Sequence, residues 1–232
     1  MYDYQVSVRK LTDEDLARSA CEMTFNGTSK QTLDSIYRSE HSPARTQLFW
    51  VTCTNIPLFV STHLLRHHVG SVPFQLTCRQ DRKGGNPRLH DLIKKIIEHF
   101  ETITDKAELK SYLTEELDWI ANNTDRYTPV NLGLMVNAQS LIDMAKLRIC
   151  LQAAEETREV FALIKKAVAA VDPALARLMV RKCVYRGGIC GEPKCCGFNH
   201  SLKFKREIEE YLENFSSLQI GGCIKDSGYE RK

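Results

Sequence analysis

An apolar pattern with helical periodicity extends from about Ala138 to Val171, and a helix of this length buries one face against a large apolar surface. Residues at offsets of 0, 4, 7, 11 and 14 share one helical stripe: Leu141, Ala145, Arg148, Gln152 and Glu155. The stripe mixes apolar with polar groups, which is typical of a helix that lines a polar cleft. We therefore expect a long helix in this part of the chain.

The preceding segments predict strands as well as helices. Residues 4–11 and 45–54 are rich in β-branched and aromatic side chains and predict strands. Helices are predicted over 13–23, 29–40 and 57–68 and, as an amphipathic pair, within 91–121. We expect Asp13 to cap the first helix, and Asn55 to cap the third with Pro57 in its first turn. The architecture is therefore mixed.

The composition limits the class of protein. With 232 residues, of which 43% are hydrophobic, the chain can bury one sizeable core, and we expect one globular domain with a short tail. A net charge of +3 is too small for a surface dedicated to nucleic acid but allows a local anion site. The N-terminus lacks the apolar core of a secretory signal, and no window reaches the roughly 18 apolar residues of a membrane span. We expect a cytoplasmic protein that contacts no membrane.

Residues 64–79, LLRHHVGSVPFQLTCR, combine two arginines and two histidines. Arginine offers five donors in a rigid fork that suits phosphate, carboxylate or a carbonyl-rich ring, and histidine changes charge near neutral pH. A short irregular loop that held Arg66, His67, His68 and Arg79 together would form a basic pocket. A solvated helix end explains the same residues, because the helix dipole favours Arg and His there. Spacing alone leaves both interpretations open.

This stretch resembles the signature of the flavin-dependent thymidylate synthases, in which Arg-His-Arg is followed by a seven-residue spacer, a serine and a further arginine. Arg66 and His67 match, and His68 stands in place of the second arginine. Thr77 and Arg79 stand for the serine and the final arginine, after a spacer that is one residue longer.

Two further blocks carry the same resemblance. Residues 136–160 are similar to the family's C-terminal helix, with these positions in the expected order: Asn137, Ser140, Leu147, Arg148, Ala153, Glu156 and Glu159. Residues 38–68 are similar to the family's His-x-Ser/Thr-Pro segment, its following strand and the proline that opens the next helix. The blocks are collinear over about residues 15–185.

The resemblance implies an α+β fold with a mixed, mainly antiparallel sheet flanked by helices, including one long C-terminal helix. It implies methylation of dUMP to dTMP, with methylenetetrahydrofolate as carbon donor and NADPH-reduced FAD as reductant. It also implies a homotetramer whose active sites lie between subunits, and a reaction that needs no cysteine nucleophile.

The resemblance assigns site residues position by position. Arg148 and Arg79 are the catalytic candidates, because an arginine beside the uracil carbonyls stabilises the charge that develops as C5 becomes nucleophilic. The candidates for holding substrate are His63, Arg66, Gln75, Thr77, Cys78, Arg79, Arg126 and Arg148. The candidates for holding FAD are Ser42, Arg66, His67, His68, Val69, Gln75, Asn137, Gln139, Asp143, Leu147 and Gln152. Without the resemblance, Asn137 is equally well a helix cap and Leu147 a core residue.

Several positions depart from the family pattern. His68 replaces a permanently charged arginine with a group whose unperturbed pKa is about 6.5. The other exchanged positions are Arg45, His63, Gln75, Gln139 and Asp143. These exchanges leave open a related product, such as 5-hydroxymethyl-dUMP, and a paralogue that binds a nucleotide without turnover. A nucleic-acid module built on the basic loop 78–88 is the weaker alternative, because the loop has no interleaved aromatic residues for stacking.

The C-terminal segment, residues 183–232, lies outside the family pattern. We expect this cysteine-rich segment and its closing helix to pack on the domain formed by residues 1–182. The chain has nine cysteines, and an odd number argues against a complete set of disulfides. Zinc needs four thiolate or imidazole ligands, and the candidates are Cys183, Cys190, Cys195 and Cys196. Their spacing lacks paired C-x2-C motifs, which favours reduced structural cysteines over zinc.

Overall fold

The computed structural model describes residues 3–24, 27–75, 87–102, 105–123 and 126–216. Within these residues four antiparallel strands form a sheet in the order β1-β2-β4-β3: β1 Gln5–Lys10, β2 Leu48–Pro57, β3 Ser71–Gln75 and β4 Pro129–Asn137. The helices, including two short 3-10 helices named η, are α1 Glu14–Glu22, α2 Leu33–Ser39, η1 Ser42–Thr46, α3 Leu58–Leu65, α4 Pro87–Thr102, α5 Lys106–Asn123, α6 Ala138–Arg148, α7 Glu155–Val171, α8 Pro173–Leu178, α9 Lys182–Tyr185, η2 Phe198–His200 and α10 Leu202–Glu213. The predicted α+β class with a mainly antiparallel sheet is confirmed.

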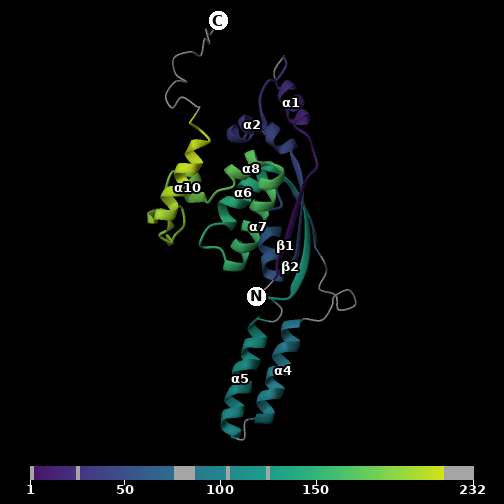
Figure 1. Ribbon diagram of the computed structural model, residues 1–232, viewed down its shortest axis with the longest axis vertical. Helices are drawn as coiled ribbons and strands as arrows, with labels where there is room; N and C mark the ends of the chain where they lie inside the picture. Colours follow the sequence, from purple (N-terminus) through teal and green to yellow (C-terminus); the bar gives the residue numbers. More distant parts are fainter. Residues whose placement is uncertain (1–2, 25–26, 76–86, 103–104, 124–125, 217–232) are drawn as a thin grey trace.

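The core lies between one face of the sheet and the helices α6, α7 and α8, as Figure 1 shows. On the central strands, Val51 pairs with Leu134, and both side chains are buried against the helices. The opposite face carries Trp50, whose ring lies over Gly133; a Cβ at that glycine would come within 2.8 Å of the ring. Phe74 from β3 packs beside Trp50, with 5.5 Å between the ring centroids. Alternation along β2 and β4 therefore separates a buried face from a partly covered one.

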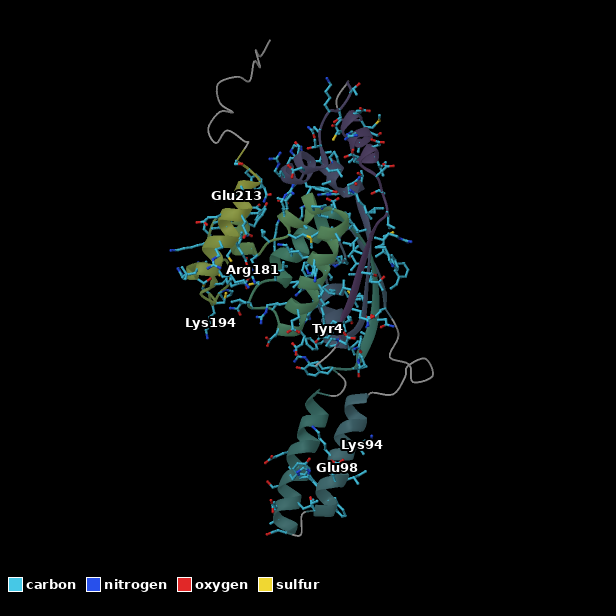
Figure 2. The ribbon with its side chains drawn as sticks, in the orientation of Figure 1. Tyr4, Lys94, Glu98, Arg181, Lys194 and Glu213 are labelled. Carbon is cyan, nitrogen blue, oxygen red and sulfur yellow. The ribbon has the colours of Figure 1, made fainter. Side chains whose placement is uncertain are left out.

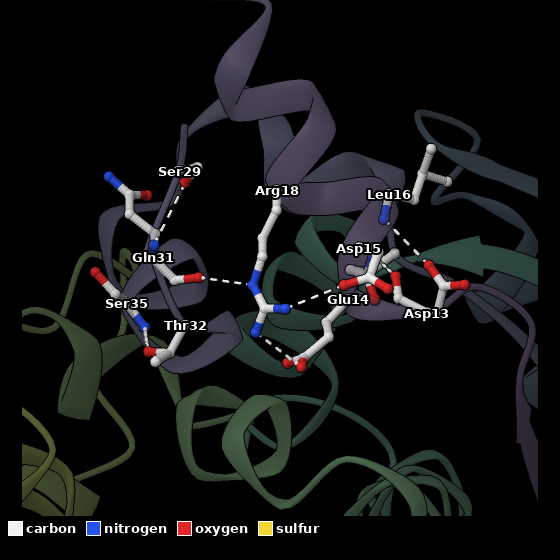
Figure 3. Close-up of polar contacts among 10 residues, drawn as sticks. Asp13, Glu14, Asp15, Leu16, Arg18, Ser29, Gln31, Thr32 and Ser35 are labelled. Atoms are coloured by element: carbon white, nitrogen blue, oxygen red, sulfur yellow. Dashed lines mark hydrogen bonds and ion pairs between the residues drawn. The ribbon is translucent and has the colours of Figure 1, made fainter. Parts of the chain in front are cut away.

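The first helix begins as the sequence predicts, whereas α2 begins at Leu33, four residues later than predicted. The Asp13 carboxylate accepts a hydrogen bond of 3.1 Å from the Leu16 amide, which caps α1. Arg18 pairs with Glu14 one turn earlier and donates from Nε to the Gln31 carbonyl at 3.4 Å, as Figure 3 shows. These contacts tie α1 to the segment that leads into α2.

The predicted continuous helix over Ala138–Val171 is wrong, because it divides into α6 and α7. The carbonyls freed by the break are satisfied locally: Arg158 Nη1 donates to Leu151 O at 3.1 Å and to Ala153 O at 3.4 Å. Glu155 and Glu156 fall in the first turn of α7, where the helix dipole favours acidic residues. The break lets α7 turn back and bury Phe161 against the sheet. Gln152 and Glu155 therefore do not share the stripe of Arg148.

The predicted cap of α3 is also wrong. Asn55 lies at an irregularity in β2 with a φ of 61°, and its side-chain amide donates to Asp3 O at 3.2 Å. Pro57 is the N-cap residue, and its side chain makes no capping bond. The first amides of α3 instead donate to backbone carbonyls beside β4, from Leu58 N to Thr128 O at 2.8 Å and from Phe59 N to Arg126 O at 3.1 Å. A neighbouring segment thus replaces the side-chain cap.

Residues 71–75 form β3, although the sequence indicates an irregular loop there, and β4 was not predicted at all. β3 contains a proline and occupies the edge of the sheet beside β4, the position where a strand proline is tolerated. Its pairing with β4 begins at Ser71 opposite Val136. Because of this pairing, the segment that follows α3 lies beside the start of α6.

The two helices predicted within 91–121 are confirmed as α4 and α5, which extend beyond those bounds at both ends. They form a hairpin that projects from the end of the sheet in Figure 1, and His99 stacks on Tyr112 at a centroid separation of 4.2 Å. Exposed Lys94 and Glu98 lie on α4 in Figure 2. No helix in the described ranges has the length and apolar character needed to cross a membrane.

The described part of the C-terminal segment comprises α9, η2 and α10. Phe198, Phe204 and Tyr211 join the same buried cluster as the residues of α6 and α7. Arg181, just before α9, forms an ion pair with Glu207 on α10. The division of the chain at residue 182 stays a prediction.

Candidate active site

The end of α3 and the end of α6 meet through a histidine and an arginine from two of the predicted motif blocks. Arg148 is the last residue of α6, and its Nε donates to Nε2 of His67 at 2.9 Å. Burial and the nearby Arg148 charge lower the pKa of His67 to about 4. His67 is therefore neutral near pH 7 and accepts from Arg148, which orients the guanidinium.

The turn after His67 fits closely against the start of α6. Ser140 Oγ donates to Val69 O at 2.6 Å, and Asn137 N donates to Gly70 O at 3.0 Å. Gly70 has a φ of 73°, and a Cβ there would lie 2.2 Å from Asn137 Nδ2, so this turn requires glycine. Asn137 Oδ1 accepts from Ser140 N at 2.8 Å, which makes Asn137 the N-cap of α6.

Arg126 adds positive charge to the site, and His63 lies close enough to respond to that charge. His63 Nδ1 lies 3.0 Å from Thr157 Oγ1 on α7, and burial followed by the charges of Arg148, Arg66 and Arg126 lowers the pKa of His63. The guanidinium of Arg126 lies 4.4 Å from the centre of the Phe59 ring. Burial and Arg66 also lower the pKa of Arg148. The charges of Arg66, Arg126 and Arg148 therefore act at one place, which suits the site to an anion.

The side of α6 that carries Gln139 and Asp143 forms a separate polar network. Gln139 Nε2 donates to Glu40 Oε2 at 2.6 Å, and Lys146 Nζ lies 3.2 Å from Glu40 and 3.1 Å from Asp143. The Lys146 ammonium also lies 3.7 Å from the centre of the Tyr185 ring. Gln139 Oε1 is buried and has no hydrogen-bond partner, so one polar atom of this network remains unsatisfied.

The remaining predicted residues are not all brought to one place. Ser42 lines a cavity of about 360 Å³ together with His41. Gln152 Nε2 donates to Lys194 O at 2.7 Å and so faces the C-terminal segment. Leu147 is 40% exposed, which contradicts a core role, and Val69 is 77% exposed.

His68 lies in the turn that follows His67, and Gln75 lies beyond it, at the end of β3. His68 is exposed, and its Nδ1 lies 3.2 Å from Arg66 O, while Gln75 is the last residue of β3. Three predicted substrate residues, Thr77, Cys78 and Arg79, lie outside the described residues. The second catalytic candidate, Arg79, therefore stays a prediction.

Sequence reasoning missed several residues that the fold places beside the predicted ones. Thr157 is buried on α7 and contacts His63, but nothing in the local sequence of α7 distinguishes it from a packing residue. Glu40 lies within the predicted block 38–68, and its position directly before His41 is the signal that could have identified it. Lys146 lies three residues after Asp143, the spacing of a helical ion pair.

Comparison with known proteins identifies a family and a similar solved structure. Residues 3–174 match the Thy1 family, described as thymidylate synthase complementing protein. Among solved structures, the fold is similar to a UMP/dUMP methylase, PolB from Streptomyces cacaoi, bound with 5-Br dUMP. The TM-score is 0.53 at 15% sequence identity, and the similarity covers 77% of this chain and 95% of that one. A search of curated proteins found no match. Because the family match spans most of its length, the chain belongs to the thymidylate synthase complementing protein family and is a transferase of the methyltransferase class.

Proposed function

We propose that the protein methylates dUMP to dTMP, with methylenetetrahydrofolate as carbon donor and NADPH-reduced FAD as reductant. The observation that carries the proposal is the hydrogen bond from Arg148 to His67, which joins two motif blocks 81 residues apart. The family match agrees with a dUMP substrate. A cationic site with an oriented arginine suits a nucleotide, because it offers charge for the phosphate and donors for the uracil carbonyls.

Arg148 has the central role in the proposed mechanism. Its fork donates to the uracil carbonyls and stabilises the negative charge that develops as C5 attacks the carbon donor. Neutral His67 orients the guanidinium by accepting a hydrogen bond from Arg148 Nε at its Nε2 atom. Arg66 and Arg126 supply positive charge for the phosphate. Arg79 is proposed to share these roles.

The residues around α6 fit a flavin. The buried and unpartnered Gln139 Oε1 is an acceptor without a donor, and the isoalloxazine ring carries an N–H group that can satisfy it. Val69 and Leu147 expose apolar surface on which a flat ring can pack. We propose that these three residues hold FAD, together with Asp143 and Ser42. When bound, FAD supplies the reducing equivalents that convert the transferred carbon into a methyl group.

A flavin titration tests the cofactor. We expect the purified protein to give the absorption spectrum of bound FAD, which bleaches when NADPH is added without oxygen. The variant Gln139→Leu removes the unpartnered acceptor at similar volume and is expected to weaken FAD binding. A protein that takes up no FAD under these conditions would refute the flavin-dependent reaction.

Product analysis tests the reaction. With methylenetetrahydrofolate and reduced FAD, mass spectrometry should find dTMP, and Arg148→Ala should reduce its rate by 10²-fold or more, on the order of a lost transition-state donor. Arg148→Lys keeps the charge but loses the fork and should recover only part of the rate. Arg177→Ala, which alters an exposed arginine paired with Asp34, is the matched control.

The same measurement separates the alternatives. A product with the mass of 5-hydroxymethyl-dUMP would show that the reaction is hydroxymethylation and not methylation. Binding of dUMP without any product would indicate a paralogue without turnover. The homotetramer with shared sites and the cytoplasmic location are further proposals. Light scattering of the purified protein tests the first of them.

A further inference from the structure

Five cysteines from three separate segments line one small cavity. Cys150 comes from the turn after α6, Cys183 from α9, and Cys190, Cys195 and Cys196 from the loop that follows. All five are free thiols. The cavity has a volume of about 20 Å³, which is room for one atom-sized ligand. Cys150 lies 33 residues before Cys183, so only the tertiary structure brings it to this cluster.

The loop that carries three of these thiols is held by hydrogen bonds but by no buried apolar side chain of its own. Between Tyr185 and Gly197 no residue is buried, and Phe198 is the first that is. The cysteines of the described residues form no disulfide. Short irregular segments without their own core are usually held by a disulfide or a metal ion. The absence of both apolar burial and a disulfide therefore favours a metal ion as the element that fixes this loop.

Local contacts around the thiols suit a bound cation. The Gly197 amide donates to Cys195 Sγ at 3.4 Å, and Gly197 has a φ of 78°. Amide donors to cysteine sulfur stabilise the thiolate form that metal ions require. Lys182 and Glu192 line the same cavity, with 4.0 Å between the ammonium and the carboxylate.

We propose that this thiol cluster, defined by Cys150, Cys183, Cys190, Cys195 and Cys196, binds one Zn²⁺ ion through four of its sulfur atoms. Cys150, Cys183 and Cys190 are three ligands, and the Cys195–Cys196 pair supplies the fourth. In the described residues no three such side chains are already arranged around a common metal position, and the site is empty. Binding therefore requires the thiols to rotate toward the cavity.

The chemistry of the thiols sets how the ion binds. Each thiol that becomes a ligand gives up a proton, so uptake of Zn²⁺ releases protons and strengthens with rising pH. The bound ion would join the turn after Arg148 to the C-terminal segment, where the hydrogen bond from Gln152 to Lys194 is already one link.

Metal analysis of the full chain tests the proposal. Protein purified under reducing conditions without chelators should contain about one zinc per chain. Cys150→Ser should reduce the zinc content to background, although this residue lies outside the cysteine-rich stretch. Cys21→Ser, which alters a buried cysteine that does not line the cavity, should retain the metal.

Cobalt substitution identifies the ligands without reference to activity. Addition of Co²⁺ to the metal-free protein should produce the visible bands of tetrahedral cobalt and a sulfur-to-cobalt charge-transfer band, and Cys150→Ser should weaken both. Circular dichroism checks that Cys150→Ser is folded. If this variant does not fold, the presence or absence of cobalt bands in the unaltered chain tests the proposal by itself. A chain that holds no zinc and gives no cobalt bands, or one in which peptide mapping finds two of these cysteines joined as a disulfide, would overturn the proposal.

Discussion

Lowering the pH should destabilise the protein through His67. In the folded chain, burial and Arg148 hold the pKa of His67 at about 4, whereas a histidine in an unfolded chain has a pKa of about 6.5. Between these two values the unfolded state binds one more proton, so the free energy of unfolding falls as the pH falls below about 6.5. Above about 6.5 both states are neutral at this residue, and the stabilising contribution is fully present.

The size of the effect follows from the difference between the two pKa values. Each pH unit between them corresponds to about 1.4 kcal/mol, so the complete contribution would be about 3 kcal/mol. His67 is only partly buried, and solvent screening roughly halves this value to about 1.5 kcal/mol. Between about pH 7 and pH 5, we expect about 1 kcal/mol of it to be lost.

Urea unfolding followed by circular dichroism, at several pH values from about 7 to 5, measures this loss. The comparison is His67→Gln, which does not titrate and keeps an acceptor for Arg148. Asp143 and His68, which also act on His67, are the same in both chains, so the difference isolates His67. His41→Gln controls for the loss of an exposed histidine. If His67→Gln and the unaltered chain show the same pH dependence, His67 is not the neutral acceptor described above.

Two further changes test how the core and the site are held. Asp172 is 4% exposed, accepts from Tyr37 Oη at 2.8 Å and pairs with Lys10 at 2.7 Å, so Asp172→Ala should lower the free energy of unfolding by about 3 to 5 kcal/mol. Asp172→Asn should cost less in the same urea titration, because it keeps the acceptor for the hydroxyl. Gly70→Ala should cost about 2 to 3 kcal/mol from backbone strain and disturbance of the Asn137 cap, and should also weaken nucleotide binding measured by calorimetry; unchanged values for both would disprove the close fit of this turn.

Local patterns were sufficient to predict several helices and strands, and the family resemblance supplied the candidate site residues. Asp13 caps α1 because its carboxylate and the amide it binds are three residues apart, a relation that short-range sequence contains. The amphipathic periods of α4 and α5 are equally local. The motif blocks identified Arg66, His67 and Arg148, and the structure brings His67 and Arg148 into contact.

Long-range relations decided the rest. The helix break after Arg148 was not predicted, because the periodicity continues through it and only the packing of α7 on the sheet requires the chain to turn. Asn55 failed as a cap because carbonyls beside β4, more than 60 residues later, take the amides of α3. Thr157 and Cys150 gained their roles through contacts between segments far apart in the chain. Sequence period encodes which face of an element is apolar, whereas the partners of its polar atoms depend on which segments the fold brings together.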